Sequence, residues 1–190
     1  MENAMSRRKR ILLTGNCEYE LLGVSHLLAG MGYAVVRPEM SPPGAYDLAL
    51  VALSAEPLVG WGRHLQGIRM LHASSPVPMV VLVPSRLQEM RLLRGTAQVI
   101  SGRDSLLRLR DMLRQALKGR AGPESSGELT DLRKRTLISL CTAINRNASL
   151  KAASRKDYYL REYAGVENLH VLCTSGLLPG VITDETGQRF

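Results

Sequence analysis

Short apolar runs alternate with helically spaced apolar positions through the first two thirds of the chain. Runs with the length of strands lie at 11–13, 33–36, 47–53, 79–83 and 98–100. Helical spacing of apolar residues follows at 20–31, 65–72, 85–94 and 104–117. Strands that alternate with helices in this way predict an α/β fold with a doubly wound, five-stranded parallel sheet over residues 10–118.

The pattern changes after residue 118. Residues 119–128 are almost free of apolar side chains and rich in glycine and serine, which is typical of a linker. Helical spacing returns at 131–144, at 149–163 and, after a turn at Gly165-Val166, at 168–175. We therefore expect a small all-α domain at 129–178, followed by a tail at 179–190 that has no assigned structure.

Residues 10–118 resemble a response-regulator receiver domain, with a first strand that ends in a Gly-Asn turn and apolar strands at 46–53 and 78–83. In that family, two acidic residues that end the first strand bind magnesium, and an aspartate that ends the third strand accepts the phosphoryl group. A Ser or Thr ends the fourth strand and a Lys ends the fifth. In this chain the corresponding positions are Gly15, Asn16, Ala52, Val83 and Gly102.

Phosphoryl transfer needs a carboxylate nucleophile and a cation that offsets the developing charge. Ala52 offers no nucleophile, and a Gly-Asn pair offers no charge to hold magnesium. The nearest carboxylates are Glu18, which belongs to the turn, and Asp47, at the wrong end of its strand. The resemblance thus implies a pseudo-receiver, an atypical response regulator that has no metal and no cofactor.

Residues 129–178 resemble the helix-turn-helix domain of LuxR/FixJ-type regulators. Leu129-Thr130 matches the opening of that motif, and 149–160, 164–166 and Asn168 match its recognition helix and close. The chain between Leu140 and Ser149 is about seven residues shorter than the family pattern, so the helix that braces the recognition helix is truncated or missing. A further likeness is to the auxiliary Rcs capsule-regulator proteins of enteric bacteria, carried by Cys17, Tyr19, Leu22 and Gly23.

The charge of the chain favours a polyanionic partner. The formal net charge is +8, and residues 129–161 contain eight Lys or Arg against two Asp or Glu. A recognition helix in the major groove uses its early exposed positions to contact bases or phosphates. The resemblance assigns DNA contact to Lys151, Ser154, Arg155, Lys156 and Arg161, with Arg133 and Lys134 on the preceding helix. The alternative is a solvated helix face.

Neither a zinc site nor a disulfide framework is indicated, because the three cysteines are far apart and no Cys/His cluster exists. We expect Cys17, Cys141 and Cys173 to be buried thiols in a reducing cytosol. The sequence also has no run of about 18 apolar residues that would span a membrane, and the basic N-terminus lacks the apolar stretch of a signal peptide.

Together these features predict a cytoplasmic bacterial transcription regulator that phosphorylation does not control. It would bind double-stranded promoter DNA as a homodimer or alongside a LuxR-type partner. The alternative is a protein-interaction module, an adaptor or anti-activator that binds a regulator without contacting DNA; the shortened brace helix favours it. An enzyme ranks last, because a flavodoxin-like enzyme needs polar chemistry at the carboxyl ends of its strands.

Overall fold

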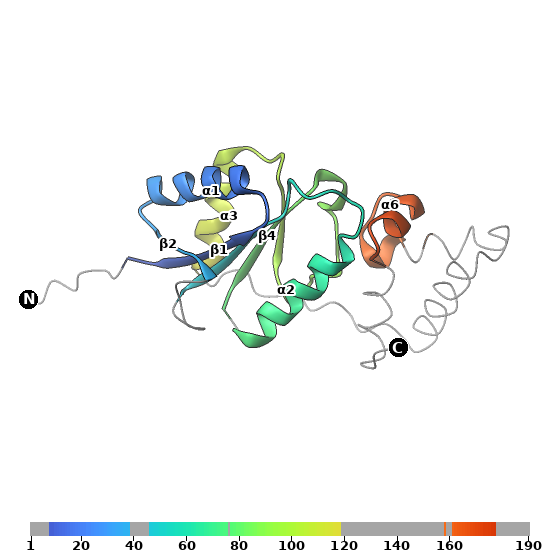
Figure 1. Cartoon of the computed structure of the whole chain (residues 1–190), viewed down its shortest axis with the longest axis horizontal. Helices are drawn as coiled ribbons and strands as arrows, with labels where there is room; N and C mark the ends of the chain where they lie inside the picture. The colour runs from blue at the N-terminus through green and yellow to red at the C-terminus, as the bar shows by residue number, and fades with distance from the viewer. Residues whose placement is uncertain (1–7, 39–45, 76, 119–157, 159–160, 178–190) are drawn as a thin grey trace, which may run out of the picture.

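A parallel sheet of five strands, in the order β2-β1-β3-β4-β5, forms the centre of the protein. The computed structural model describes residues 8–38, 46–75, 77–118, 158 and 161–177. Every predicted strand is confirmed, with these bounds: β1 Arg10–Gly15, β2 Ala34–Val36, β3 Leu48–Ala52, β4 Met79–Val83 and β5 Gln98–Ser101. All five residues of β3 and of β4 are buried. The α/β fold class follows from this sheet and its helices (Figure 1).

Hydrogen bonds between β1 and the start of β3 fix the amino edge of the sheet. The backbone N–H of Arg10 donates to Oδ2 of Asp47 at 2.7 Å, and the N–H of Asp47 donates to the carbonyl of Arg10 at 2.8 Å. Asp47 therefore lies at the opposite end of β3 from Ala52, as the sequence predicted.

One face of the sheet is covered by α1 (Glu18–Gly30) and α3 (Leu106–Leu117), which lie on the same side in Figure 1. The alternate residues Ile11 and Leu13 of β1 point to this face and pack with Leu28 of α1 and Leu113 of α3. The hydroxyl of Ser105 caps α3, accepting a hydrogen bond from the N–H of Arg108 at 3.2 Å.

The other face is covered by α2 (Gly62–Ser74) and by two segments that are not long helices. The helix predicted at 85–94 is wrong: a 3₁₀ turn, η2 (Ser85–Leu87), is followed by turns. In an α-helix the N–H of Arg91 would donate within its own segment. It donates instead to the carbonyl of Ala164 at 2.9 Å, so a contact with the C-terminal segment replaces the helical bond.

The C-terminal segment 161–177 packs against this second face. Residues 161–164 are helical, Gly165 adopts a φ of +69°, and Asn168 caps α6 (Leu169–Thr174) by accepting the N–H of Val171 at 2.9 Å. The predicted turn at 165–166 and the helix after it are confirmed. Buried residues of the segment join the core around Trp61: Ala164, Val166, Val171, Leu172 and Leu177.

The remaining parts of the C-terminal prediction lie outside the described residues. These parts are the linker at 119–128, most of the all-α domain at 129–178 and the tail at 179–190. The domain boundaries therefore stay a prediction.

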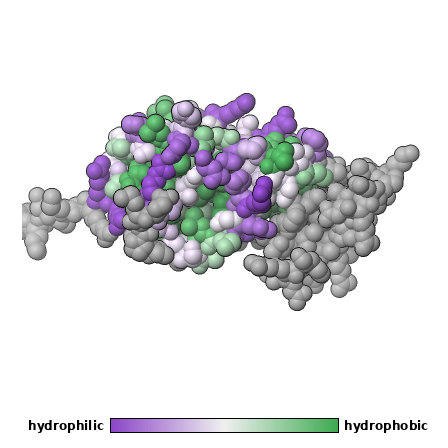
Figure 2. Space-filling model, viewed as in Figure 1, coloured by the Kyte–Doolittle hydropathy of each residue, from purple (hydrophilic) through white to green (hydrophobic). Residues whose placement is uncertain are grey.

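The two cysteines that the structure describes differ from the expectation of buried thiols. Cys17 is half-buried, and Cys173 is exposed on α6, so that prediction is wrong for Cys173. Cys141 lies outside the described residues. Among the helices that the structure describes, none has the length and apolar character to span a membrane. Figure 2 shows one face on which polar residues separate several smaller apolar patches.

Candidate functional site

The carboxyl edge of the sheet brings the predicted receiver-like positions together. Gly15, Ala52 and Val83 are the last residues of β1, β3 and β4, and Gly102 follows directly after β5. Gly15 and Ala52 are partners in register, and the N–H of Gly102 donates to the carbonyl of Val83 at 2.9 Å. Asn16 follows Gly15 and is exposed. These positions, which the resemblance to a receiver domain aligned, therefore lie at one edge of the sheet.

Of the four strand-end positions, Ala52 and Val83 carry apolar side chains, and Gly15 and Gly102 carry none. Ala52 is 1% exposed and packs on the side of α1 and α3, whereas Val83 is fully buried on the side of α2. A Cβ atom at Gly15 would overlap the carbonyl oxygen of Ala52, and one at Gly102 would overlap the side chain of Ser54. These neighbours therefore leave no room for an aspartate at position 15 or a lysine at position 102 without local rearrangement.

Glu20 of α1 brings a carboxylate to the loop after β3. Its Oε1 accepts hydrogen bonds from the backbone N–H and the hydroxyl of Ser54, at 3.1 and 2.5 Å. Its Oε2 accepts the N–H of Ala55 at 3.2 Å. Three donors of the loop after β3 thus bind this carboxylate. We conclude that the carboxylate stabilises the conformation of that loop.

Sequence reasoning missed Glu20 and named Glu18 and Asp47 as the nearest carboxylates. Glu18 instead lies 3.8 Å from Nη2 of Arg37, with an 82% exposed side chain. The sequence feature that could have identified Glu20 is its place in the first turn of the helix after β1. That turn and the loop after β3 lie at the same carboxyl edge of a parallel sheet.

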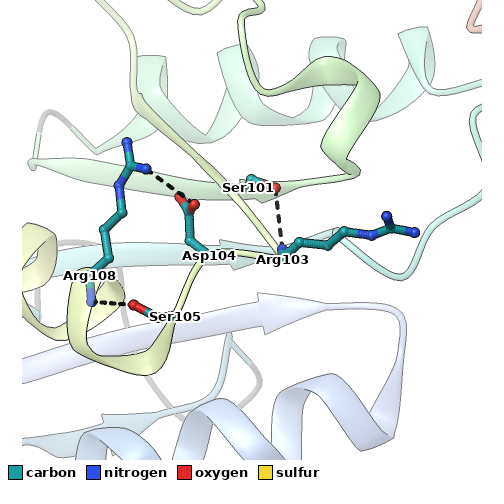
Figure 3. Close-up of polar contacts among 5 residues, drawn as sticks. All are labelled: Ser101, Arg103, Asp104, Ser105 and Arg108. Carbon is teal, nitrogen blue, oxygen red and sulfur yellow. Dashed lines mark hydrogen bonds and ion pairs between the residues drawn. The ribbon is translucent and has the colours of Figure 1, made fainter.

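Asp104, in the loop after β5, is the next carboxylate at this edge. Figure 3 shows it directed at Arg108, with Oδ1 3.3 Å from Nη1, while the side chain of Arg103 extends away from it. The backbone N–H of Arg103 donates a hydrogen bond to Oγ of Ser101 at 3.2 Å. The described residues contain no group of three or more His, Cys, Asp or Glu side chains placed to hold a metal ion.

Of the seven residues predicted to contact DNA, the structure describes Arg161. Arg161 is half-buried, and its Nη1 donates to the carbonyl of Glu167 at 3.0 Å. This bond links the helical residues 161–164 to the loop before α6. The other six positions lie outside the described residues: Arg133, Lys134, Lys151, Ser154, Arg155 and Lys156. Their contact with DNA stays a prediction.

Comparison with known proteins finds likeness in structure alone. No protein-family model matches the sequence, and no curated protein matches it. RcsB from Salmonella enterica serovar Typhimurium, bound to promoter P1flhDC in the presence of the phosphomimetic BeF3-, has 16% identity and a TM-score of 0.62. That match covers 92% of this chain and 99% of RcsB. At this identity the likeness establishes a shared fold.

Two further structures match with lower scores. RcsB from the same organism bound to promoter rprA has 16% identity and a TM-score of 0.48, covering 90% of this chain and 98% of that one. The receiver domain of the sensor histidine kinase PA1611 from Pseudomonas aeruginosa PAO1 has 19% identity and a TM-score of 0.43. It covers 58% of this chain and 98% of its own.

Proposed function

We propose that this chain is an auxiliary transcription regulator that binds promoter DNA and is not controlled by phosphorylation. The observation that carries the proposal is the carboxyl edge of a receiver-like sheet on which Gly15, Ala52 and Val83 end the strands. The net charge of +8 favours a polyanionic partner. RcsB, which shares the fold, is bound to promoter DNA in its structure, and this supports DNA as that polyanion.

Independence from phosphorylation follows from the chemistry of that edge. A phosphoryl acceptor needs a nucleophilic carboxylate, and Ala52 has none. The carboxylate of Glu20 already accepts three hydrogen bonds from the loop after β3, and Asp104 pairs with Arg108. In our proposal the amount of the protein, or of its partner, takes the place of a phosphorylation switch.

The docked C-terminal segment supports a DNA-binding role for the helix predicted at 149–160. In the sequence, the segment that would form the brace of a recognition helix is about seven residues shorter than in LuxR/FixJ-type regulators. In this chain, Ala164 accepts the N–H of Arg91 at 2.9 Å, and Ser175 accepts the N–H of Gly62 at 2.8 Å. These bonds hold the segment that follows 149–160 against the α/β domain. In our proposal the α/β domain acts as the brace that positions Arg155 and Lys156.

Exposed apolar side chains support a protein partner. Tyr19 and Leu22 of α1 are 88% and 56% exposed, and Leu106 and Leu107 at the start of α3 are 66% and 70% exposed. Both helices lie on the same face of the sheet. This face suits a second copy of the chain or a LuxR-type regulator. The same observation favours the second candidate function, a module that binds a regulator without contacting DNA.

The DNA that co-purifies with the chain from native bacterial cytosol, once sequenced, supplies the probe for a binding test. Affinity should fall steeply with rising salt because phosphate contacts release condensed counterions. The double variant R155E/K156E should lose binding by about tenfold or more. The control R63E/R86E changes the net charge equally at two exposed arginines of the α/β domain and should bind nearly as the parent does.

Binding of R155E/K156E at the parent's affinity would show that the DNA-binding part of the proposal is wrong. Co-purification of a regulator without any DNA would then support the interaction module.

A further inference from the structure

A cavity of about 390 Å³ lies at the amino edge of the sheet, opposite the edge described above. Residues just before β1, just before β2 and at the end of α3 line it. Four of these residues are cationic: Arg8, Lys9, Arg114 and Lys118. In Figure 1 the amino end of β1 and α6 lie at opposite ends of the sheet, so the cavity is separate from the docked C-terminal segment.

Two of the cations are held in place by backbone carbonyl groups. Nε of Arg8 donates to the carbonyl of Gly32 at 2.7 Å, and Nζ of Lys9 donates to the carbonyl of Leu117 at 2.7 Å. Cations near helix C-termini stabilise the helix dipole, which explains part of this arrangement. That role uses one donor of each side chain. The guanidinium of Arg8 and the ammonium of Lys9 keep further N–H groups for a ligand.

Among the residues that the structure describes, few carboxylates offset the positive charge of the cavity. Arg114 lies 3.5 Å from Asp111. Arg8, Lys9 and Lys118 have no carboxylate within 4.0 Å among the residues that the structure describes. Arg114 and Lys118 are also four residues apart on α3, a spacing at which like charges repel.

We propose that this cavity binds the phosphate group of a nucleotide unit. An arginine and three further cations around one hollow match the charge of phosphate, and a guanidinium can donate two parallel hydrogen bonds to it. The half-buried side chains of Tyr33 and Leu117 add an apolar wall that suits a sugar or base. The cavity volume falls within the range of small-molecule sites, about 300–1,000 Å³.

The nucleotide unit has two possible sources, a free nucleotide and the backbone of a nucleic acid. The site goes beyond the proposed function, because it uses none of the residues at 133–161 that are assigned to DNA contact. The full chain is therefore titrated at constant ionic strength with ATP, inorganic pyrophosphate, adenosine and a short DNA duplex.

The cavity variant is R8Q/K118Q, and its matched control is R86Q/R103Q, which removes two exposed arginines near the opposite edge. ATP or duplex DNA should bind the parent at least about tenfold more tightly than adenosine does. The cavity variant should lose about tenfold in that affinity, whereas the control should stay within about twofold. K118Q alone leaves the bonds from Arg8 and Lys9 intact, so it provides the test if the double variant does not fold.

The pattern of losses identifies the source of the phosphate. A loss of ATP and pyrophosphate binding in the cavity variant indicates a free nucleotide, and a loss confined to the duplex indicates a nucleic-acid backbone. Failure of every phosphate probe to bind, equal binding of adenosine and ATP, or equal losses in the cavity variant and the control would overturn the proposal. R155E/K156E keeps the cavity, so nucleotide binding by that variant separates this inference from the DNA-binding proposal.

Discussion

Glu20 and Ser54 are joined by two hydrogen bonds, from the backbone N–H and from the hydroxyl of Ser54 to the same carboxylate oxygen, at 3.1 and 2.5 Å. The contact spans 34 positions of sequence and ties the first turn of α1 to the loop after β3. The carboxylate therefore shapes the carboxyl edge of the sheet, where a receiver domain would place its reactive groups.

Glu20→Gln should lower the free energy of unfolding. The amide removes the negative charge and turns an N–H donor toward the donors of Ser54 and Ala55, and hydrogen bonds to charged groups contribute about 1.5–3 kcal/mol. We expect a loss of about 1–3 kcal/mol in urea denaturation. Glu18→Gln is the control, since that exposed side chain should change stability by less than about 0.5 kcal/mol. Equal losses in both variants would contradict the structural role of Glu20.

An aspartate at position 52 should not make the chain accept a phosphoryl group. Ala52 is 1% exposed among apolar residues, so Ala52→Asp buries a carboxylate and should lower stability by more than about 2 kcal/mol. Asn16→Asp adds the same group at an exposed position of the same edge and should stay within about 0.5 kcal/mol.

Mass spectrometry after incubation with acetyl phosphate and magnesium measures phosphoryl uptake. We expect none in the parent or in either variant. A phosphorylated parent chain would contradict regulation without phosphorylation.

The sheet could be predicted from the sequence because parallel strands that are covered on both faces appear as short apolar runs. The resemblance to a receiver domain then aligned Gly15, Ala52 and Val83 with one edge of this sheet. The contact between Glu20 and Ser54 could not be predicted in the same way, because it depends on the shape of a loop far away in the sequence. Apolar spacing indicates that a side chain is buried, and it does not indicate which residue a polar group meets.

The helix predicted at 85–94 failed for a related reason. Local spacing favoured a helix, and the bond from the N–H of Arg91 to Ala164 shows a distant segment determining the backbone there. The local sequence pattern also predicted the turn at Gly165-Val166 and the helix after it. It carried no information on the surface against which α6 packs, because that surface is built from residues about a hundred positions earlier.

Two glycine variants should separate the docking of the C-terminal segment from simple backbone strain. Gly165 and Gly95 both have positive φ, +69° and +78°, so alanine costs about 1–2 kcal/mol at either position. A Cβ at Gly165 would also overlap the carbonyl oxygen of Glu89, whereas a Cβ at Gly95 meets nothing within 4 Å. We expect Gly165→Ala to lose about 1–3 kcal/mol more than Gly95→Ala.

Trp61 provides the spectroscopic measurement for the two glycine variants. It is the single tryptophan, is fully buried, and shares a core with α6. Its emission should shift to longer wavelength in Gly165→Ala and stay unchanged in Gly95→Ala. Identical stability and emission in the two variants would contradict docking of residues 161–177 on the α/β domain.

Exposed leucines on α1 and α3 should determine association with a second protein. Leu22 and Leu106 are 56% and 66% exposed, so L22Q/L106Q should change the free energy of unfolding by less than about 0.5 kcal/mol. If the proposed partner surface is on this face, the dissociation constant should rise by about tenfold, because buried apolar anchors dominate interface energies. Met70→Gln is the control, since Met70 is 70% exposed on α2, across the sheet.

Sedimentation equilibrium measures self-association, and co-purification from native cytosol measures capture of another regulator. Unchanged association by both measurements would place the partner surface elsewhere on the chain.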